Sequence, residues 1–170
     1  MVSLRRYNVH FSRANNKAID DAFNAVANIS GTTESMLLEC LRHYGSQGTA
    51  NLATITQQYT RVKAYRKGLD DHIADICSKA SLPTDKTRHL IALGHVALEL
   101  ENIAELSAMI ASQTNLDDSG YYGNVFRPTS AMGRLIRAQL KMAIDALMAT
   151  NEQRALQAWL SNADIREMQM

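Results

Sequence analysis

The chain has 170 residues, of which 46% are hydrophobic, and a formal net charge of +1 at pH 7. This apolar content is enough for a sizeable core and excludes a disordered chain. The balanced charge excludes a basic face of the kind that binds nucleic acid. With only two prolines and eight glycines in a chain rich in Ala, Leu, Ile and Met, the composition predicts an all-α protein.

Residues 1–14 show little helical apolar pattern and are predicted to be an irregular lead-in or linker. From about residue 15 to residue 44, apolar and small residues recur at the spacing of one helix face, which predicts a first long helix. Its weakest point is Ser30-Gly31-Thr32-Thr33, where a kink could form. A single glycine costs only about 1 kcal/mol in a helix and need not break it.

A turn at residues 45–48 leads to a second predicted helix that ends near residue 80. Apolar residues form a seam along it, alternating three and four residues as in a coiled coil. Arg66 interrupts this seam. Either its side chain passes its neighbours to reach water, or it neutralises an acid on a facing helix.

The third predicted helix follows Ser81–Asp85, and its stretch from Arg88 to Ile110 is the most continuous helical run of the sequence. Small residues form one stripe of this helix, and Glu101 lies within that stripe. Glu105 follows one turn later. Because a buried carboxylate needs a partner, a proton or a metal, we expect Glu101 to face the second helix near Asp70 or Arg66.

The long loop predicted at residues 115–128 is followed by a fourth helix from about residue 129 and a fifth from about residue 151. The chain therefore reads as a three-helix unit, residues 15–113, followed by an incomplete second unit, residues 129–170. Without a sixth helix, the faces that carry Ile136, Leu140, Trp159 and Leu160 would be partly uncovered. A homodimer or the rest of a larger protein could bury them. Alternatively, both helices fold back onto the first unit.

No catalytic arrangement is evident, so the chain is predicted not to be an enzyme and no cofactor is expected. Cys40 and Cys77 lack an activating context and are interpreted as buried, reduced thiols. No glycine-rich phosphate loop is present. No run reaches the roughly 18 apolar residues that a membrane span needs, and no signal peptide is recognisable. We therefore expect a soluble chain without direct membrane insertion.

Two sequence stretches resemble the PhoU-like family, and most closely the C-terminal PhoU-like domain of bacterial sodium-dependent phosphate cotransporters. The first is Leu69-Asp70-Asp71-His72-Ile73, late in the second helix. The second is Leu100-Glu101-Asn102-Ile103-Ala104-Glu105, which is similar to the family signature Leu-Glu-Arg-Ile-Gly-Asp. The order of the helices is also similar, and the resemblance covers about residues 15–168.

The resemblance implies an antiparallel long-helix bundle with a regulatory or scaffolding role in phosphate transport. Its partner would be the membrane portion of a transporter, in the same or another protein, and its location cytoplasmic and membrane-associated through that portion. The family sometimes binds a divalent or ferric metal through acids on facing helices. Carried over to this chain, the metal ligands would be Asp70, Glu101 and Glu105, although Ala74 stands four residues after Asp70, where the family has another acid. The alternative role of Glu101 is a buried, salt-bridged acid.

Overall fold

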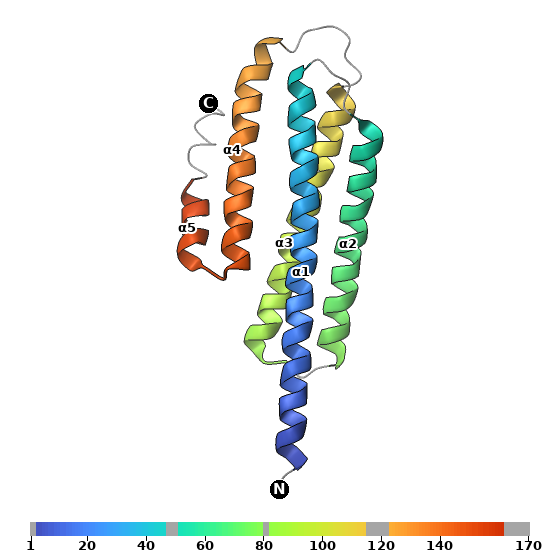
Figure 1. The fold of residues 1–170 in the computed structure, drawn as a ribbon, viewed down its shortest axis with the longest axis vertical. Helices are drawn as coiled ribbons and strands as arrows, with labels where there is room; N and C mark the ends of the chain where they lie inside the picture. The colour runs from blue at the N-terminus through green and yellow to red at the C-terminus, as the bar shows by residue number, and fades with distance from the viewer. Residues whose placement is uncertain (1–2, 47–50, 80–81, 115–122, 162–170) are drawn as a thin grey trace.

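The computed structural model is all-helical in the part of the chain that it describes, as the composition predicts (Figure 1). It describes the backbone of residues 3–46, 51–79, 82–114 and 123–161, and within these ranges the side chains of residues 17–42, 51–78, 82–113 and 131–161. The helices there are α1 (Ser3–Ser46), α2 (Leu52–Lys79), α3 (Thr84–Thr114), α4 (Gly123–Met148) and α5 (Glu152–Leu160). None of the helices described is both long and apolar enough to span a lipid bilayer.

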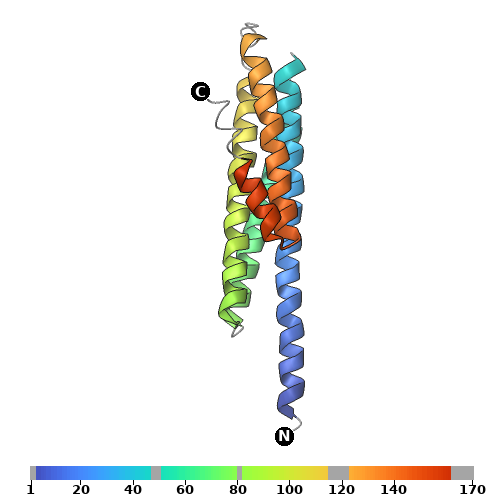
Figure 2. The same ribbon diagram turned by 90° about the vertical axis from the view of Figure 1, so that its left-hand side faces the viewer.

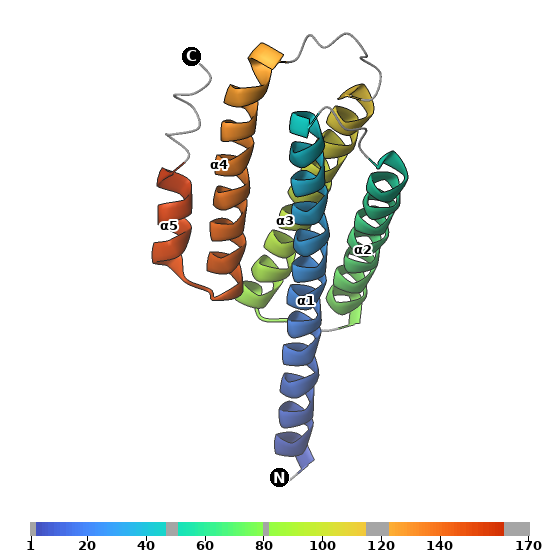
Figure 3. The same cartoon turned by 45° about the horizontal axis from the view of Figure 1, so that its top comes forward.

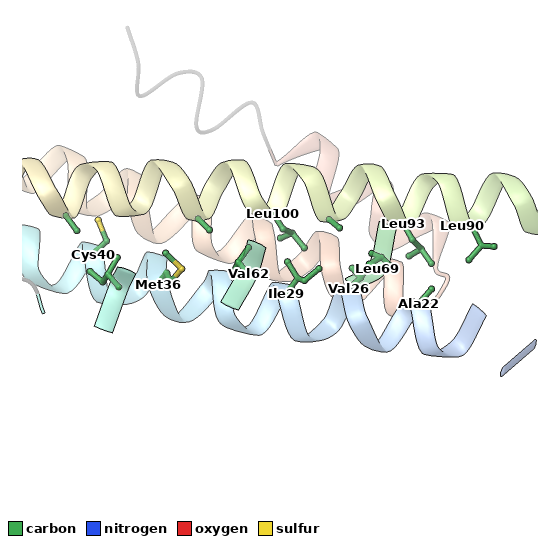
Figure 4. Packing of buried hydrophobic residues seen from close by; sticks show 14 of the residues in the cluster. Ala22, Val26, Ile29, Met36, Cys40, Val62, Leu69, Leu90, Leu93 and Leu100 are labelled. Carbon is green, nitrogen blue, oxygen red and sulfur yellow. The ribbon is translucent and has the colours of Figure 1, made fainter. Parts of the chain in front are cut away.

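Helices α1, α2 and α3 pack against one another as an antiparallel three-helix bundle. Their buried side chains form one continuous core, because each helix contributes large apolar residues at helical spacing (Figure 4). The largest fully buried members are Ile29, Met36, Ile55, Leu69, Leu90, Leu93 and Leu100. One polar contact crosses this core, where Thr33 Oγ1 donates to the Leu100 carbonyl oxygen at 3.3 Å. The bundle thus corresponds to the predicted three-helix unit.

Helix α4 lies along α1 and forms the second layer of the molecule (Figure 2). Gly133 makes this close approach possible, because a Cβ at that position would overlap the side chain of Leu41 on α1. Arg137 Nε also bonds Glu34 Oε1 at 3.0 Å across the same contact. Among the described helices, α5 packs on α4 alone, on its outer side (Figure 3).

Two helix starts differ from the sequence-based expectation. Helix α1 begins at Ser3, so the irregular lead-in predicted for residues 1–14 is wrong from Ser3 onward. No proline or glycine precedes Gly31, and nothing in the local sequence stops the helix. Helix α4 begins at Gly123, six residues before the predicted start, and continues through Pro128. The second unit, predicted as residues 129–170, therefore begins earlier, at Gly123. Residues 115–122 and 162–170 lie outside the part of the chain that the structure describes.

Local sequence accounts for the continuity of α1 and for the starts of α2 and α5. Helix α1 runs without interruption past Gly31, so no break occurs at the Ser30–Thr33 patch. Asn51 precedes α2, and its Oδ1 accepts a hydrogen bond from the Thr54 amide at 3.1 Å. Asn151 caps α5 in the same way, accepting from the Arg154 amide at 3.0 Å. Such side-chain acceptors satisfy amides that have no partner in the first turn of a helix.

Candidate functional site

The candidate site lies where α2 and α3 face each other beside the core. On α3, Leu100 and Ala104 are buried in the bundle, and Glu101 is the residue next to Leu100 at the edge of that buried stripe. Its side chain is only 16% exposed. A carboxylate with so little water around it requires a donor from the facing helix.

Arg66 of α2 is that donor. Its Nε lies 2.6 Å from Glu101 Oε2, and its Nη2 lies 3.1 Å from Asp70 Oδ2. The planar guanidinium presents several N–H donors at fixed angles, so one side chain serves both carboxylates. Of the two alternatives for Arg66, the structure has the second, an ion pair with an acid on a facing helix. Glu101 faces Arg66, as its place in the small-residue stripe predicts.

Glu105 extends the cluster one helical turn along α3. Burial raises the pKa of the Tyr59 hydroxyl on α2, and the negative charges of Glu105 and then Glu101 raise it further. Lys63 Nζ of α2 lies 5.4 Å from the centroid of the Tyr59 ring, within the range of a cation–π contact. Tyr59 is therefore near a cation of its own helix as well as near two acids of α3.

Tyr59 and Lys63 complete a stripe that the sequence interpretation did not assign to the site. Together with Arg66 and Asp70 they recur at intervals of four, three and four residues on α2, which places them on one side of that helix. The spacing was the only available signal. It could not be used without knowing which side of α2 meets α3.

The arrangement suits an electrostatic contact between two helices. The cluster combines two cations, Lys63 and Arg66, with three carboxylates, those of Asp70, Glu101 and Glu105. Arg66 already neutralises two of the three carboxylates proposed as metal ligands. Within the described residues, no group of three or more His, Cys, Asp or Glu side chains is placed to hold a metal ion.

Helix α2 also contacts α1 beside a shallow groove of about 410 Å³, whose lining residues include Asp21, Tyr65, Gly68 and His72. His72 Nε2 lies 3.0 Å from the Ala18 carbonyl oxygen, so this nitrogen carries the hydrogen and donates it. No role was predicted for His72. Its role here is to join α2 to α1.

The interaction residues predicted on the fifth helix, Trp159 and Leu160, are exposed on α5. Ile136 on α4 is partly exposed, whereas Leu140 packs against the main core. The two cysteines also differ, because Cys40 is buried and Cys77 is exposed. The expectation that both thiols are buried is therefore wrong for Cys77.

No family model, curated protein or solved structure matches this chain. The resemblance to the PhoU-like family consequently rests on the Leu100–Glu105 signature, on the Asp70 stretch and on the order of the helices.

Proposed function

We propose that this chain is a non-enzymatic PhoU-like regulatory or scaffold domain of a phosphate transport system. Its partner is the membrane portion of a sodium–phosphate cotransporter, and it works on the cytoplasmic side of the membrane. The observation that carries the proposal is the signature helix α3, whose Glu101 is held by Arg66 of α2 within a three-helix bundle. The signature resemblance supplies the link to phosphate, and the geometry supplies a role for its central acid.

A scaffold role suits the physical properties of this site. The Arg66–Glu101 pair is partly screened by solvent, so we expect it to contribute only about 1 kcal/mol to stability. Its geometry is nevertheless specific, because Asp70 on α2 itself orients the guanidinium of Arg66, whose bond to Glu101 then joins one position of α2 to one position of α3. The domain would act by presenting a rigid helical surface to its transporter.

The test is phosphate uptake by cells that lack the gene and carry either the original chain or a variant. We expect deletion to change uptake, the original chain to restore the normal value, and Glu101→Gln to restore it only in part. Glu99→Gln is the matched control, since it makes the same chemical change on the exposed side of α3. Circular dichroism must show that both variants keep their helical content.

Unchanged uptake after deletion would reject the link to phosphate. The chain would then be interpreted as a helical protein-interaction module with another partner. If Glu99→Gln impaired uptake as strongly as Glu101→Gln, the role given to the Arg66–Glu101 pair would be wrong, even if deletion confirmed the link to phosphate.

The alternative function is metal binding by Asp70, Glu101 and Glu105. It is favoured by one observation, the convergence of Asp70 and Glu101 on a single cationic group, Arg66. A divalent or ferric ion would have to displace that guanidinium. Elemental analysis of protein purified without chelator, beside the Asp70→Ala and Glu101→Ala variants, decides this point, and the absence of metal from every sample rejects it.

A further inference from the structure

Helix α3 carries large apolar side chains on the side that faces away from the bundle. They are 40% to 57% exposed, and we define them as the outer stripe: Ile91, Leu98, Leu106 and Met109. Ile91 and Met109 are 18 residues apart, about five turns, so they share one line of the helix, and Leu98 and Leu106 lie within about 60° of that line. The buried Leu100 is nine residues from both Ile91 and Met109, about two and a half turns, and therefore lies on the opposite side.

The outer stripe has no cover among the described helices. There, α3 contacts only α1 and α2, which lie on its core side. Figure 2 shows α3 along one edge of the molecule, opposite the edge formed by α1. A continuous apolar line on an exposed helix face is typical of a surface that binds a partner.

Charge limits what this partner can be. After Arg88, α3 carries three acids and no Lys or Arg. One of the acids, Glu105, is exposed and lies about 40° from the line of Ile91 and Met109. Two outer stripes that met face to face would bring like charges together, which disfavours pairing of α3 with a second α3. The outer stripe instead suits an apolar segment that carries positive charge.

The first part of this chain has that charge. Helix α1 projects beyond the ends of α2 and α3 (Figure 1), and we define its residues 3–17 as the N-terminal arm. The arm contains no acid, since the first acid of the chain is Asp20. It contains four cations, Arg5, Arg6, Arg13 and Lys17. Helix α4 is also basic, but its Arg137 and Lys141 are already paired with acids of the same chain.

The N-terminal arm also has apolar residues in a helical register, which follows once α1 is known to begin at Ser3. Leu4, Tyr7 and Phe11 are three and four residues apart, and Leu4 precedes the buried Ala22 by 18 residues, about five turns. Their positions therefore continue the line of α1 that packs in the bundle. That line extends into the part of α1 that projects beyond α2 and α3 (Figure 1).

We propose that two copies of the chain form a twofold dimer by exchanging arms, so that the N-terminal arm of each copy docks on the outer stripe of the other. The apolar positions of the arm cover the stripe. The cations of the arm then lie within about 10 Å, one helix diameter, of Glu105, a range over which charges still interact at physiological salt. The arm does not reach the stripe of its own chain, because α1 leaves the bundle without a turn (Figure 1).

The dimensions of the two elements match. The N-terminal arm is about 22 Å long, and the outer stripe from Ile91 to Met109 is about 27 Å long. Two arms and two stripes together bury on the order of 1,000 Å², which is enough for a specific interface. Once one arm has docked, the second contact forms within the same complex, so the two contacts reinforce each other. The inference is independent of the proposed role in phosphate transport.

Deletion of residues 1–16 tests the arm. For the original chain, we expect sedimentation and light scattering to give the mass of one chain, 18.9 kDa, at nanomolar concentration and twice that mass at high micromolar concentration. The shortened chain should stay a monomer throughout. Its bundle should remain folded by circular dichroism, because the buried residues Ala22, Val26 and Ile29 are kept.

Leu106→Glu tests the outer stripe and should raise the dimer dissociation constant at least tenfold. Leu156→Glu is the matched control, because Leu156 on α5 is 56% exposed and Leu106 is 57% exposed. The control should dimerise like the original chain. A control that weakened the dimer as strongly as Leu106→Glu would place the interface elsewhere and overturn the proposal.

Reversal of charge tests whether the arm and the stripe meet. One variant carries Arg5→Glu and Arg6→Glu in the arm, and the other carries Asn102→Lys and Glu105→Lys beside the stripe. Each variant alone should dimerise at least tenfold more weakly than the original chain, because like charges then meet. An equimolar mixture should regain the mass of a dimer, since each arm then meets a stripe of opposite charge. Partial unfolding of either variant would not produce this recovery.

Three further results would overturn the proposal. The first is an original chain that is a monomer at every concentration. The second is a dimer that persists after deletion of residues 1–16, which would show that the arm is not part of the interface. The third is a mixture of the two charge-reversed variants that associates no better than either variant alone.

Discussion

The α1–α3 bundle and the α4–α5 hairpin follow opposite packing rules. In the bundle, large side chains such as Ile29, Leu93 and Leu100 are buried, alongside four alanines. In the hairpin, the buried hydrophobic residues are alanines, whereas Leu156 and Trp159 face outward. Burial of large apolar side chains is the main favourable term in folding. The bundle should therefore carry most of the stability, and the hairpin should open at much lower free energy.

The largest expected difference in the free energy of unfolding is between two leucine-to-alanine substitutions. Leu100→Ala removes a fully buried side chain from the bundle, and we expect a loss of about 2 to 5 kcal/mol in the free energy of unfolding. Leu156→Ala makes the same change on the exposed face of α5 and should cost less than about 0.5 kcal/mol in the monomer. Urea denaturation at low protein concentration measures both. Equal losses would contradict the division of stability between the two regions.

Alkaline pH tests the packing of the bundle, because one of its buried side chains, Cys40, can ionise there. Burial raises the pKa of this thiol from 9.0 to about 11 in the folded chain. Well below pH 9 the thiol is protonated in both states and its contribution to stability is complete. Between pH 9 and pH 11 the unfolded chain releases the proton first, so stability falls, by about 2 to 3 kcal/mol for the whole interval.

The measurement compares the free energy of unfolding across this pH range for the original chain and for Cys40→Ala. The variant should lose stability less steeply, because it lacks the thiol. Cys77→Ala is the control and should keep the slope of the original chain, since Cys77 is exposed. Equal slopes for all three proteins would show that Cys40 is not buried as described.

The junction between the two regions depends on Gly133. Gly133→Ala adds a methyl group that overlaps Leu41, and we expect it to destabilise the docking of α4 on α1 by about 1 to 3 kcal/mol. Hydrogen exchange should then quicken in α4 and α5 and stay unchanged in α2 and α3. The double variant Leu41→Ala with Gly133→Ala should recover part of this protection. Without such recovery, the overlap with Leu41 would not be the cause.

Sequence patterns predicted the bundle better than the hairpin, for a physical reason. A periodic apolar stripe reports that a helix side is buried, but the interruption at Arg66 left two alternatives, contact with water or a pair with a facing acid, and only the structure identifies the pair with Glu101. The part played by Tyr59 depends on the rotation of α2 relative to α3, which no local pattern encodes. Gly133 likewise reads as a weak point of a helix, and only the docked structure explains it as a point of close approach to Leu41 of α1.

The smallest expected change in stability comes from a substitution in the turn between α4 and α5. Thr150 has a φ of 47°, in the left-handed region that a β-branched residue rarely adopts. The amides of Thr150 and Asn151 donate to the carbonyl oxygens of Leu147 and Ala146, at 3.0 and 2.9 Å. These two bonds form the helix-terminating motif in which glycine is favoured.

Thr150→Gly should therefore stabilise the turn by about 1 kcal/mol. Because the turn belongs to the hairpin, the gain should appear as slower hydrogen exchange in α5 and at the end of α4, while exchange in α1–α3 stays the same. Ala149→Gly is the control, since the residue before Thr150 does not have a positive φ and gains nothing from glycine. Protection that spread equally to α2 and α3 would mean that hairpin and bundle open as one cooperative unit, against the contrast in their packing.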